Sequence, residues 1–378
     1  MRIFYASDTT PNSSFKSNLW RNNLLFPLLD LGHDVIEFDY DLAETFQHLD
    51  GTKSKNAAFI TKNRPQVSEE LLKQIHRAHE KKPLDLFFSY FYDACVLPET
   101  IDTIKEMGIV TVNWYCNGAH QLHLVTEISP HYDWCLVPEK FRMNDYVQMG
   151  AKPVYSQEAA NPHIYKPYNL KKEYDVTFIG QSYGNRPDYV QQILQNDISI
   201  KVWGKGWEKH IDPTVNAKNK LSKHFKRLLS TRQKINLPQQ VIGGVLTDEE
   251  MIKMYSRSKI NLGFSVCGET HKNSVPILQV RLRDFEIPMS GGFYMVEYME
   301  ELEAFYEIGK EIVCYSGVDD LIEKIKYYLR HEPEREKIRK AGYERCQRDH
   351  TWHKRFQLAF AQMGLTGKAG KSVQEMSP

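Results

Sequence analysis

The feature that most constrains the fold is a repeated alternation of short apolar runs with longer helical segments. The first run is 3–6, and a helical spacing of leucines follows over 18–31. Strands separated by helices at such intervals form a parallel, doubly wound sheet. Further strands of the first half are expected at 35–38, 84–91, 109–114 and 134–137. The sequence therefore predicts an α/β fold.

The alternation stops over 161–173 and starts again at Tyr174. That stretch is rich in Pro, Tyr and Lys and has no apolar period, which is typical of a connection between domains. A chain of 378 residues has room for two domains of ordinary size. We expect a Rossmann-like domain over 1–160, a second over 174–366, and a disordered tail of small and polar residues over 367–378.

The overall charge argues against a general attraction to polyanions. Lys and Arg total 49 and Asp and Glu total 48, which gives a formal net charge of +1. A protein with this balance has no field that recruits nucleic acid, so an anion site must be local. The opening apolar run is too short for a signal peptide, and no run is long enough to span a membrane. The expected location is the cytoplasm.

The segment 218–234 interrupts the alternation. It carries seven Lys and Arg residues and no acidic residue, and its apolar residues lie on one helical stripe. This pattern predicts an inserted amphipathic basic helix. Its apolar stripe would pack on the second domain, on an anionic membrane surface as a peripheral contact, or on a second subunit.

Two glycine-containing turns follow strands of the second half. The turn 180–186 ends with Arg186 and opens a helix, whose free N–H groups can hold a phosphate. A tight turn with a surface arginine fits the same residues. The turn 204–206 carries Lys205 at the end of the next strand, where open α/β sheets bind ligands. A flexible turn with a solvated lysine is the alternative there.

Charged residues gather around the helix that precedes Gly291. Lys272 and Arg281 come before it, and Arg283 and Glu286 lie three apart on one helical face. A salt bridge on a surface helix explains this spacing. Alternatively, Arg283 binds a phosphate, and Glu286 accepts from two vicinal hydroxyls of a ribose.

A polar loop follows a strand of the first half. It contains Asn117, His120 and His123. Histidine titrates near neutral pH, so either His120 or His123 is a candidate general base. A structural hydrogen-bonding role is the competing interpretation.

Several motifs carry a family resemblance. They are VTFIGQ, INLGFS, RLRDFEIPMSGGF, GKEIVCY, LIEKIKYYLRHEPEREKIRKAGYER and DHTW in the second half, and VNWYCNG, YDWCLVP and YSQEAANP in the first. With these motifs the chain resembles the CgeB-like, spore-maturation-type glycosyltransferases of the GT-B superfamily. The resemblance implies two Rossmann-like doubly wound domains that face a central cleft. It also implies a nucleotide-sugar donor on the second domain.

The resemblance implies roles for individual residues. It puts 180–186 and Lys205 near the phosphates, and Arg283 and Glu286 near phosphate and ribose. The candidate donor-binding residues are Gly180, Gln181, Tyr183, Arg186, Lys205, Lys272, Arg283, Glu286 and Gly291. Leu278 stands where retaining relatives carry the first of two glutamates. Asn117-Gly118 stands where the family often carries an acidic pair, which leaves His120 or His123 as the base.

The sequence thus predicts an enzyme that moves a sugar from a nucleotide to a glycan, lipid or protein acceptor. A nucleotide-sugar-binding protein without turnover is an alternative. A doubly wound epimerase or dehydrogenase is a third, against which the absence of GxGxxG counts. No metal is expected, since the cysteines lack zinc-site spacing and positive side chains can neutralise a leaving diphosphate.

Overall fold

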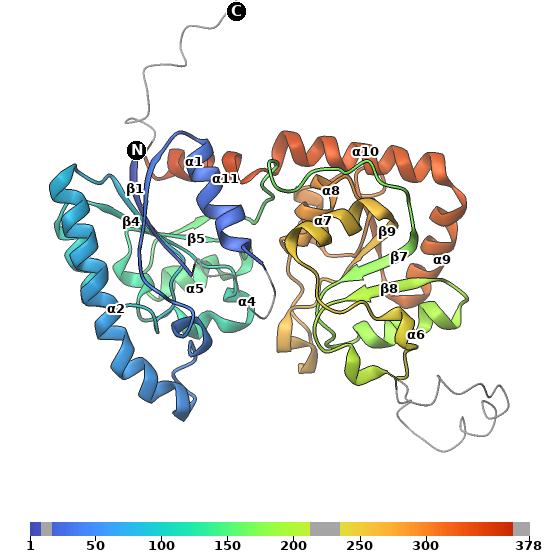
Figure 1. The fold of residues 1–378 in the computed structure, drawn as a ribbon, viewed down its shortest axis with the longest axis horizontal. Helices are drawn as coiled ribbons and strands as arrows, with labels where there is room; N and C mark the ends of the chain where they lie inside the picture. The colour runs from blue at the N-terminus through green and yellow to red at the C-terminus, as the bar shows by residue number, and fades with distance from the viewer. Residues whose placement is uncertain (9–16, 212–234, 366–378) are drawn as a thin grey trace, which may run out of the picture. The chain divides into compact units, whose positions relative to one another are not determined.

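The computed structural model describes residues 1–8, 17–211 and 235–365. The described residues divide into two compact units (Figure 1). Unit 1 consists of residues up to 164 together with those from 349 onward, and unit 2 runs from 165 to 348. The basic segment 218–234 and the tail 367–378 lie outside the described residues.

Unit 1 is built on a six-stranded parallel sheet with the order β2-β1-β3-β4-β5-β6. Its strands are β1 (Arg2–Ala6), β2 (Asp34–Glu37), β3 (Leu86–Ser89), β4 (Val110–Trp114), β5 (Trp134–Val137) and β6 (Pro153–Tyr155). Every residue of β1 and β3 is buried, because helices cover both faces of a parallel sheet.

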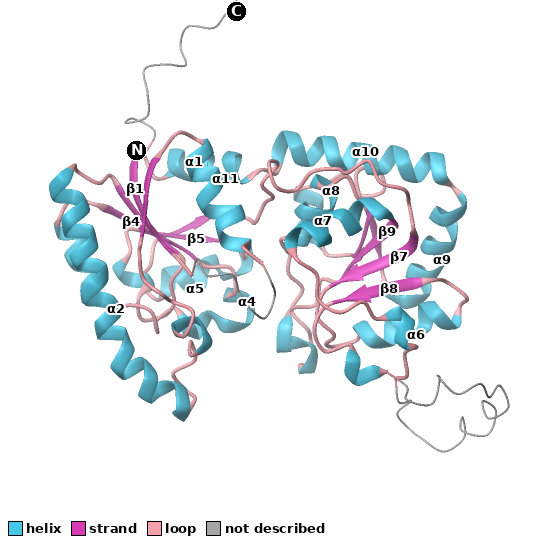
Figure 2. Ribbon diagram, viewed as in Figure 1, coloured by secondary structure: helices cyan, strands magenta, loops and turns pink. Residues whose placement is uncertain are grey.

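The helices of unit 1 lie on both sides of its sheet (Figure 2). They are α1 (Phe26–Asp30), α2 (Ser54–Lys81), α3 (Pro98–Glu106), α4 (Gly118–Gln121), α5 (Met143–Gln148) and α11 (Trp352–Gln362). α1 continues a π-helical turn, Arg21–Leu25, and packs against α11.

The helix α11 belongs to unit 1, although it comes last in the chain. The Trp352 ring lies 5.3 Å from that of Trp114, and the Phe356 ring lies 5.6 Å from that of Phe88. α11 packs on unit 1 because its aromatic rings are buried against the first sheet. Unit 2 ends at Arg348, whereas the second domain was expected over 174–366.

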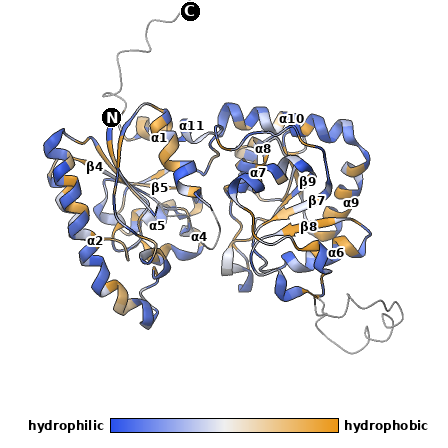
Figure 3. Ribbon diagram, in the orientation of Figure 1, coloured by the Kyte–Doolittle hydropathy of each residue, from blue (hydrophilic) through white to orange (hydrophobic). Residues whose placement is uncertain are grey.

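Unit 2 is built on a five-stranded parallel sheet with the order β11-β10-β9-β7-β8. Its strands are β7 (Tyr174–Ile179), β8 (Ile200–Trp203), β9 (Ser258–Gly263), β10 (Tyr294–Glu297) and β11 (Val313–Tyr315). Its helices are α6 (Arg186–Gln195), α7 (Asp248–Arg257), α8 (Arg283–Met289), α9 (Gly317–Arg330) and α10 (Glu332–Asp349). Figure 3 shows apolar residues along these strands and hydrophilic residues along α10. The expected fold class, α/β with two doubly wound sheets, is confirmed.

The strand order of unit 2 contains a switch point. The chain leaves β7 towards β8 on one side, and later returns to β9 on the other side. The loops that follow β7 and β9 therefore diverge, and ligands of open α/β sheets bind at such a point. No helix among the residues described is long and apolar enough to cross a membrane.

Candidate functional site

Two glycine turns run side by side at the carboxyl ends of β7 and β8. The Gly180 N–H donates to the Trp203 carbonyl at 2.8 Å, and the Ser182 N–H donates to the Lys205 carbonyl at 3.0 Å. Gly204 has a φ of +131°, and a Cβ there would lie 2.3 Å from the Gly180 carbonyl oxygen. At Gly204, glycine is thus needed for the approach of one turn to the other.

Arg186 begins α6 and is buried. Its guanidinium carbon lies 3.7 Å from the Tyr183 ring centroid and also packs over Phe178. Nη1 donates to the Gln181 carbonyl at 2.9 Å, and Nη2 donates to the Tyr183 hydroxyl at 2.6 Å. Burial lowers the pKa of Arg186 to about 9, so the side chain remains a cation at neutral pH. The sequence offered Arg186 as a phosphate ligand or as a surface arginine; the structure shows a buried cation that holds the 180–186 turn together.

Arg283 is the first residue of α8 and lies at the end of β7. Its Nη2 is 3.3 Å from the position that a Cβ on Gly180 would take, and its guanidinium carbon is 5.6 Å from the Phe178 ring centroid. Its Nε is buried and has no hydrogen-bond partner among the described residues. Arg283 therefore brings a positive charge to the switch point.

Glu286 lies one turn further along α8 and is 5% exposed. Burial raises the pKa of its carboxyl to about 7, while a hydrogen bond with Tyr165 and the charge of Arg283 act in the opposite direction. The Oε1 atom is buried and has no hydrogen-bond partner in the described part of the chain. A solvated surface salt bridge, the competing interpretation of this residue, does not describe a buried carboxyl.

The first turn of α8 is held by a second buried carboxyl, Asp284. It accepts from the Arg281 N–H at 2.8 Å and from the Tyr294 hydroxyl. The Tyr306 hydroxyl donates to the Asp284 carbonyl at 2.7 Å. These bonds fix the backbone from which Arg281 and Arg283 extend.

Several buried polar atoms at this end of unit 2 lack hydrogen-bond partners among the described residues. Among them are Ser182 Oγ, Arg281 Nε, Arg283 Nε and Glu286 Oε1. Buried polar groups are nearly always satisfied in native proteins. Two guanidinium groups, a hydroxyl and a carboxyl match a ligand that is anionic at one end and carries hydroxyls at the other.

The other predicted donor-binding residues are less closely involved. Gln181 is exposed and contributes its carbonyl to Arg186, Lys205 is half-buried, and Lys272 is exposed in a 3₁₀ turn, Gly268–Lys272. Gly291 follows the opposite end of α8 from Arg283. Its φ is +68°, and a Cβ there would lie 2.9 Å from Pro167 Cγ. Gly291 therefore serves a tight turn and close packing.

The predicted acid–base residues of unit 1 lie on and beside α4 and differ in their surroundings. Asn117 Nδ2 donates to the hydroxyls of Tyr90 and Tyr92 at 3.3 and 3.1 Å. His120 is half-buried on α4, whereas His123 is exposed, with its Nε2 4.0 Å from Asp50 Oδ1. The Asn117 amide is thus engaged in two hydrogen bonds.

A buried carboxyl of unit 1 was not predicted from the sequence. Glu139 follows β5, is 1% exposed and accepts from the Ala119 N–H at 3.3 Å. Burial raises its pKa to about 7. Its contact fixes the start of α4, the helix that carries His120. The only sequence signal was its position directly after a buried strand.

The buried carboxyl of Glu286 makes stability depend on pH. Its folded pKa of about 7 exceeds the ordinary 4.5, so the folded state binds the extra proton between these values. The stability contribution is complete below pH 4.5 and is lost as the pH rises through 7. We expect Glu286→Gln to flatten the fall of the melting temperature between pH 5 and 8.

Calorimetric scans at several pH values measure this effect. Glu323→Gln on the exposed face of α9 is the matched control and should reproduce the wild-type profile. An unchanged slope in Glu286→Gln would show that the carboxyl titrates normally.

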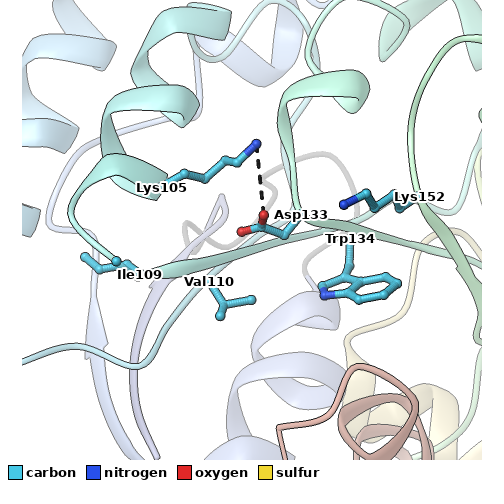
Figure 4. Close-up of a pocket in the computed structure, with 7 residues that line it drawn as sticks. Lys105, Ile109, Val110, Asp133, Trp134 and Lys152 are labelled. Atoms are coloured by element: carbon cyan, nitrogen blue, oxygen red, sulfur yellow. Dashed lines mark ion pairs between the residues drawn. The ribbon is translucent and has the colours of Figure 1, made fainter.

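A cavity of unit 1 lies at the end of the sheet where the strands begin (Figure 4). It has a volume of about 420 Å³ and lies where β4 and β5 begin, beside Lys105, Asp133 and Lys152. Lys105 Nζ is 4.0 Å from Asp133 Oδ1, and Asp133 also accepts from the Thr111 N–H at 2.9 Å. The charges of Lys105 and Asp133 are already paired. Because ligands of open α/β sheets bind at the carboxyl ends of the strands, this cavity at the amino ends is a weaker candidate than the switch point.

Comparison with known proteins relates this chain to a protein family and to solved structures. Residues 186–361 match a protein family described as glycosyl transferase-like. No match was found among curated proteins.

Solved structures share the fold at low sequence identity. Sucrose-phosphate synthase from Thermosynechococcus elongatus is 12% identical with a TM-score of 0.60, covering 96% of this chain and 98% of that one. HepE of Anabaena in complex with UDP-glucose is 11% identical with a TM-score of 0.54, covering 96% and 99%. An α-glucosyltransferase in complex with UDP-glucose and DNA containing an abasic site is 13% identical with a TM-score of 0.56, covering 96% and 97%.

Proposed function

We propose that this chain is a glycosyltransferase of the GT-B fold class and that it uses a nucleoside-diphosphate sugar bound by unit 2. The family match begins at Arg186 and covers most of that unit. The observation that carries the proposal is the group of unsatisfied buried polar atoms at the switch point. Two proteins of similar fold were solved with UDP-glucose, which supports this class of donor. The finer assignment to the CgeB-like subfamily is part of the proposal.

In this proposal Arg283 binds the diphosphate. Its guanidinium lies beside Gly180, where the turn leads into the N-terminus of α6, and free N–H groups there favour phosphate. Arg281 adds a second positive charge. Glu286 accepts from vicinal hydroxyls of the nucleoside or the sugar, because one carboxylate can take two hydroxyl donors.

The reaction follows from these contacts. An acceptor hydroxyl attacks the anomeric carbon, the bond from that carbon to the diphosphate oxygen breaks, and negative charge develops on the leaving diphosphate. Preorganised cations stabilise such charge strongly where water is excluded. Arg283 and Arg281 supply that stabilisation in this proposal without a metal ion at the donor site. The acceptor is a glycan, a lipid-linked sugar or a protein.

His120 is the proposed base that receives the proton of the acceptor hydroxyl. It is half-buried on a helix that Glu139 holds in place, whereas His123 is exposed. We expect His120→Ala to lower kcat and leave the donor KM unchanged, while His123→Ala has little effect on either. Steady-state kinetics of both variants measures the difference. Equal activity of His120→Ala and the wild type would remove this residue from the mechanism.

A donor screen tests the proposed function directly. Nucleoside-diphosphate sugars are added to the purified full-length protein, and the melting temperature is recorded. A ligand at a hundred times its Kd adds about 2.7 kcal/mol of stability, which is readily detected. Absence of a shift with every nucleotide sugar would overturn the proposal.

Turnover separates the enzyme from a binding protein. Release of free nucleoside diphosphate in the presence of an acceptor, or by slow hydrolysis without one, supports a transferase. A stabilising donor that is never consumed would favour the alternative of binding without turnover.

A further inference from the structure

Three potential metal ligands meet on unit 1, away from the residues discussed so far. Asp30 is the last residue of α1, His163 follows β6, and His353 is the second residue of α11. The distance from Asp30 Oδ2 to His353 Nε2 is 3.1 Å, and that to His163 Nε2 is 3.8 Å. All three ligand atoms lie within 4.8 Å of one another.

The backbone fixes the segments that carry these side chains. The His163 N–H donates to the side chain of Asn161 at 3.0 Å, and Asn161 is fully buried. The Trp352 N–H donates to the Ala160 carbonyl at 3.3 Å. This bond joins the segment after β6 to the start of α11. α1 packs against α11 and brings Asp30 to the same point. The cluster is thus set by the fold and does not depend on a single loop.

The chemistry of the three groups suits a divalent transition metal. Two imidazole nitrogens and a carboxylate oxygen are typical zinc ligands, with bond lengths near 2.0–2.2 Å and a tetrahedral arrangement. Ligand atoms of such a tetrahedron are about 3.4 Å apart, and the two measured distances to Asp30 lie on either side of that value. The His163 side chain is 68% exposed, so it can rotate to complete the geometry. Solvent access leaves a fourth position for water.

We propose that Asp30, His163 and His353 form a Zn²⁺ site that ties together two segments of unit 1. His163 lies just before the chain passes into unit 2, and His353 lies just after it returns. The ion therefore clamps the exit and the re-entry of the chain. This site is separate from the donor site and does not depend on the proposed transferase activity. This proposal departs from the expectation of no metal. That expectation rested on cysteine spacing, and Asp30, His163 and His353 are too far apart in sequence to form a recognisable metal motif.

Calorimetric titration of metal-free, tag-free full-length protein with ZnCl₂ tests the site. We expect one equivalent to bind with a Kd below about 10 μM and to raise the melting temperature, because binding to the folded state alone stabilises it. His163→Ala and His353→Ala should each weaken binding by at least about tenfold. Co²⁺ in place of Zn²⁺ should give the visible absorption of a tetrahedral site in the wild type, and this absorption should be lost in His163→Ala and His353→Ala.

The chain offers a matched control in a second histidine–carboxylate pair. His131 Nδ1 lies 2.7 Å from Asp102 Oδ2, and no third potential ligand joins this pair among the described residues. His131→Ala should bind Zn²⁺ as the wild type does. The proposal is overturned if the wild type binds no more tightly than about 100 μM. It is also overturned if the His163 and His353 variants bind as the wild type does, which would leave an ordinary ion-paired cluster.

Discussion

Arg283→Ala is expected to lower kcat/KM for the sugar donor by about 10²–10³-fold, the effect typical of removing one preorganised charge-stabilising donor. The guanidinium of Arg283 lies over Phe178 and beside Gly180, where the diphosphate is proposed to bind. Arg186 is engaged in holding the 180–186 turn together, so it cannot move to take over this role. Part of the loss should appear as weaker binding of the free nucleoside diphosphate, which calorimetry measures without an acceptor.

Variants of neighbouring and remote residues show whether the effect is local. Arg283→Lys keeps the charge but loses the planar fork, so it should recover only part of the activity. Glu286→Ala should weaken binding of the nucleotide sugar by about ten- to a hundredfold, because charge-assisted hydrogen bonds are lost. Arg330→Ala, at the exposed end of α9, should match the wild type. Wild-type kinetics in Arg283→Ala would exclude a donor site at the switch point.

The sheets were predictable because their strands are buried on both faces. Runs such as that over 109–114 are largely apolar, and the intervals between runs require helices. By contrast, the sequence pattern does not indicate the full length of α2, which extends from Ser54 to Lys81. Its first half includes Pro65 and has most of its apolar residues in one run over 57–60, so it lacks the spaced stripe that reveals an amphipathic helix.

The candidate site could be proposed from the sequence where a single segment carries its residues. Arg283 and Glu286 share a short helix, and their spacing alone placed them on one face. The burial of Arg186 depends instead on Tyr183, Phe178 and the exit of β9, which are brought around it only by the fold. Glu139 meets α4 across two strand exits for the same reason. Sequence patterns report neighbours along the chain, whereas these contacts are made across it.

Gly204→Ala is expected to destabilise unit 2 by at least about 3 kcal/mol, because it combines backbone strain with a steric clash. Residues other than glycine rarely adopt the φ of +131° that Gly204 has. The added Cβ would lie 2.3 Å from the Gly180 carbonyl oxygen and 3.2 Å from the Gln181 nitrogen. Both are backbone atoms and cannot rotate away, so the turns must separate and the hydrogen bond from Gly180 to Trp203 must weaken.

A second glycine separates strain from clash. Gly309, also in unit 2, has a φ of +83°, and no atom lies within 4 Å of the position that a Cβ would take there. Gly309→Ala should therefore show strain alone, about 1–2 kcal/mol. Urea denaturation followed by circular dichroism compares the two variants. Because Arg283 lies against the Gly180 turn, Gly204→Ala should also weaken donor binding at temperatures where the protein remains folded, whereas Gly309→Ala should not. If the two variants lose equal stability and both keep donor affinity, the close approach of the β7 and β8 turns does not shape the donor site.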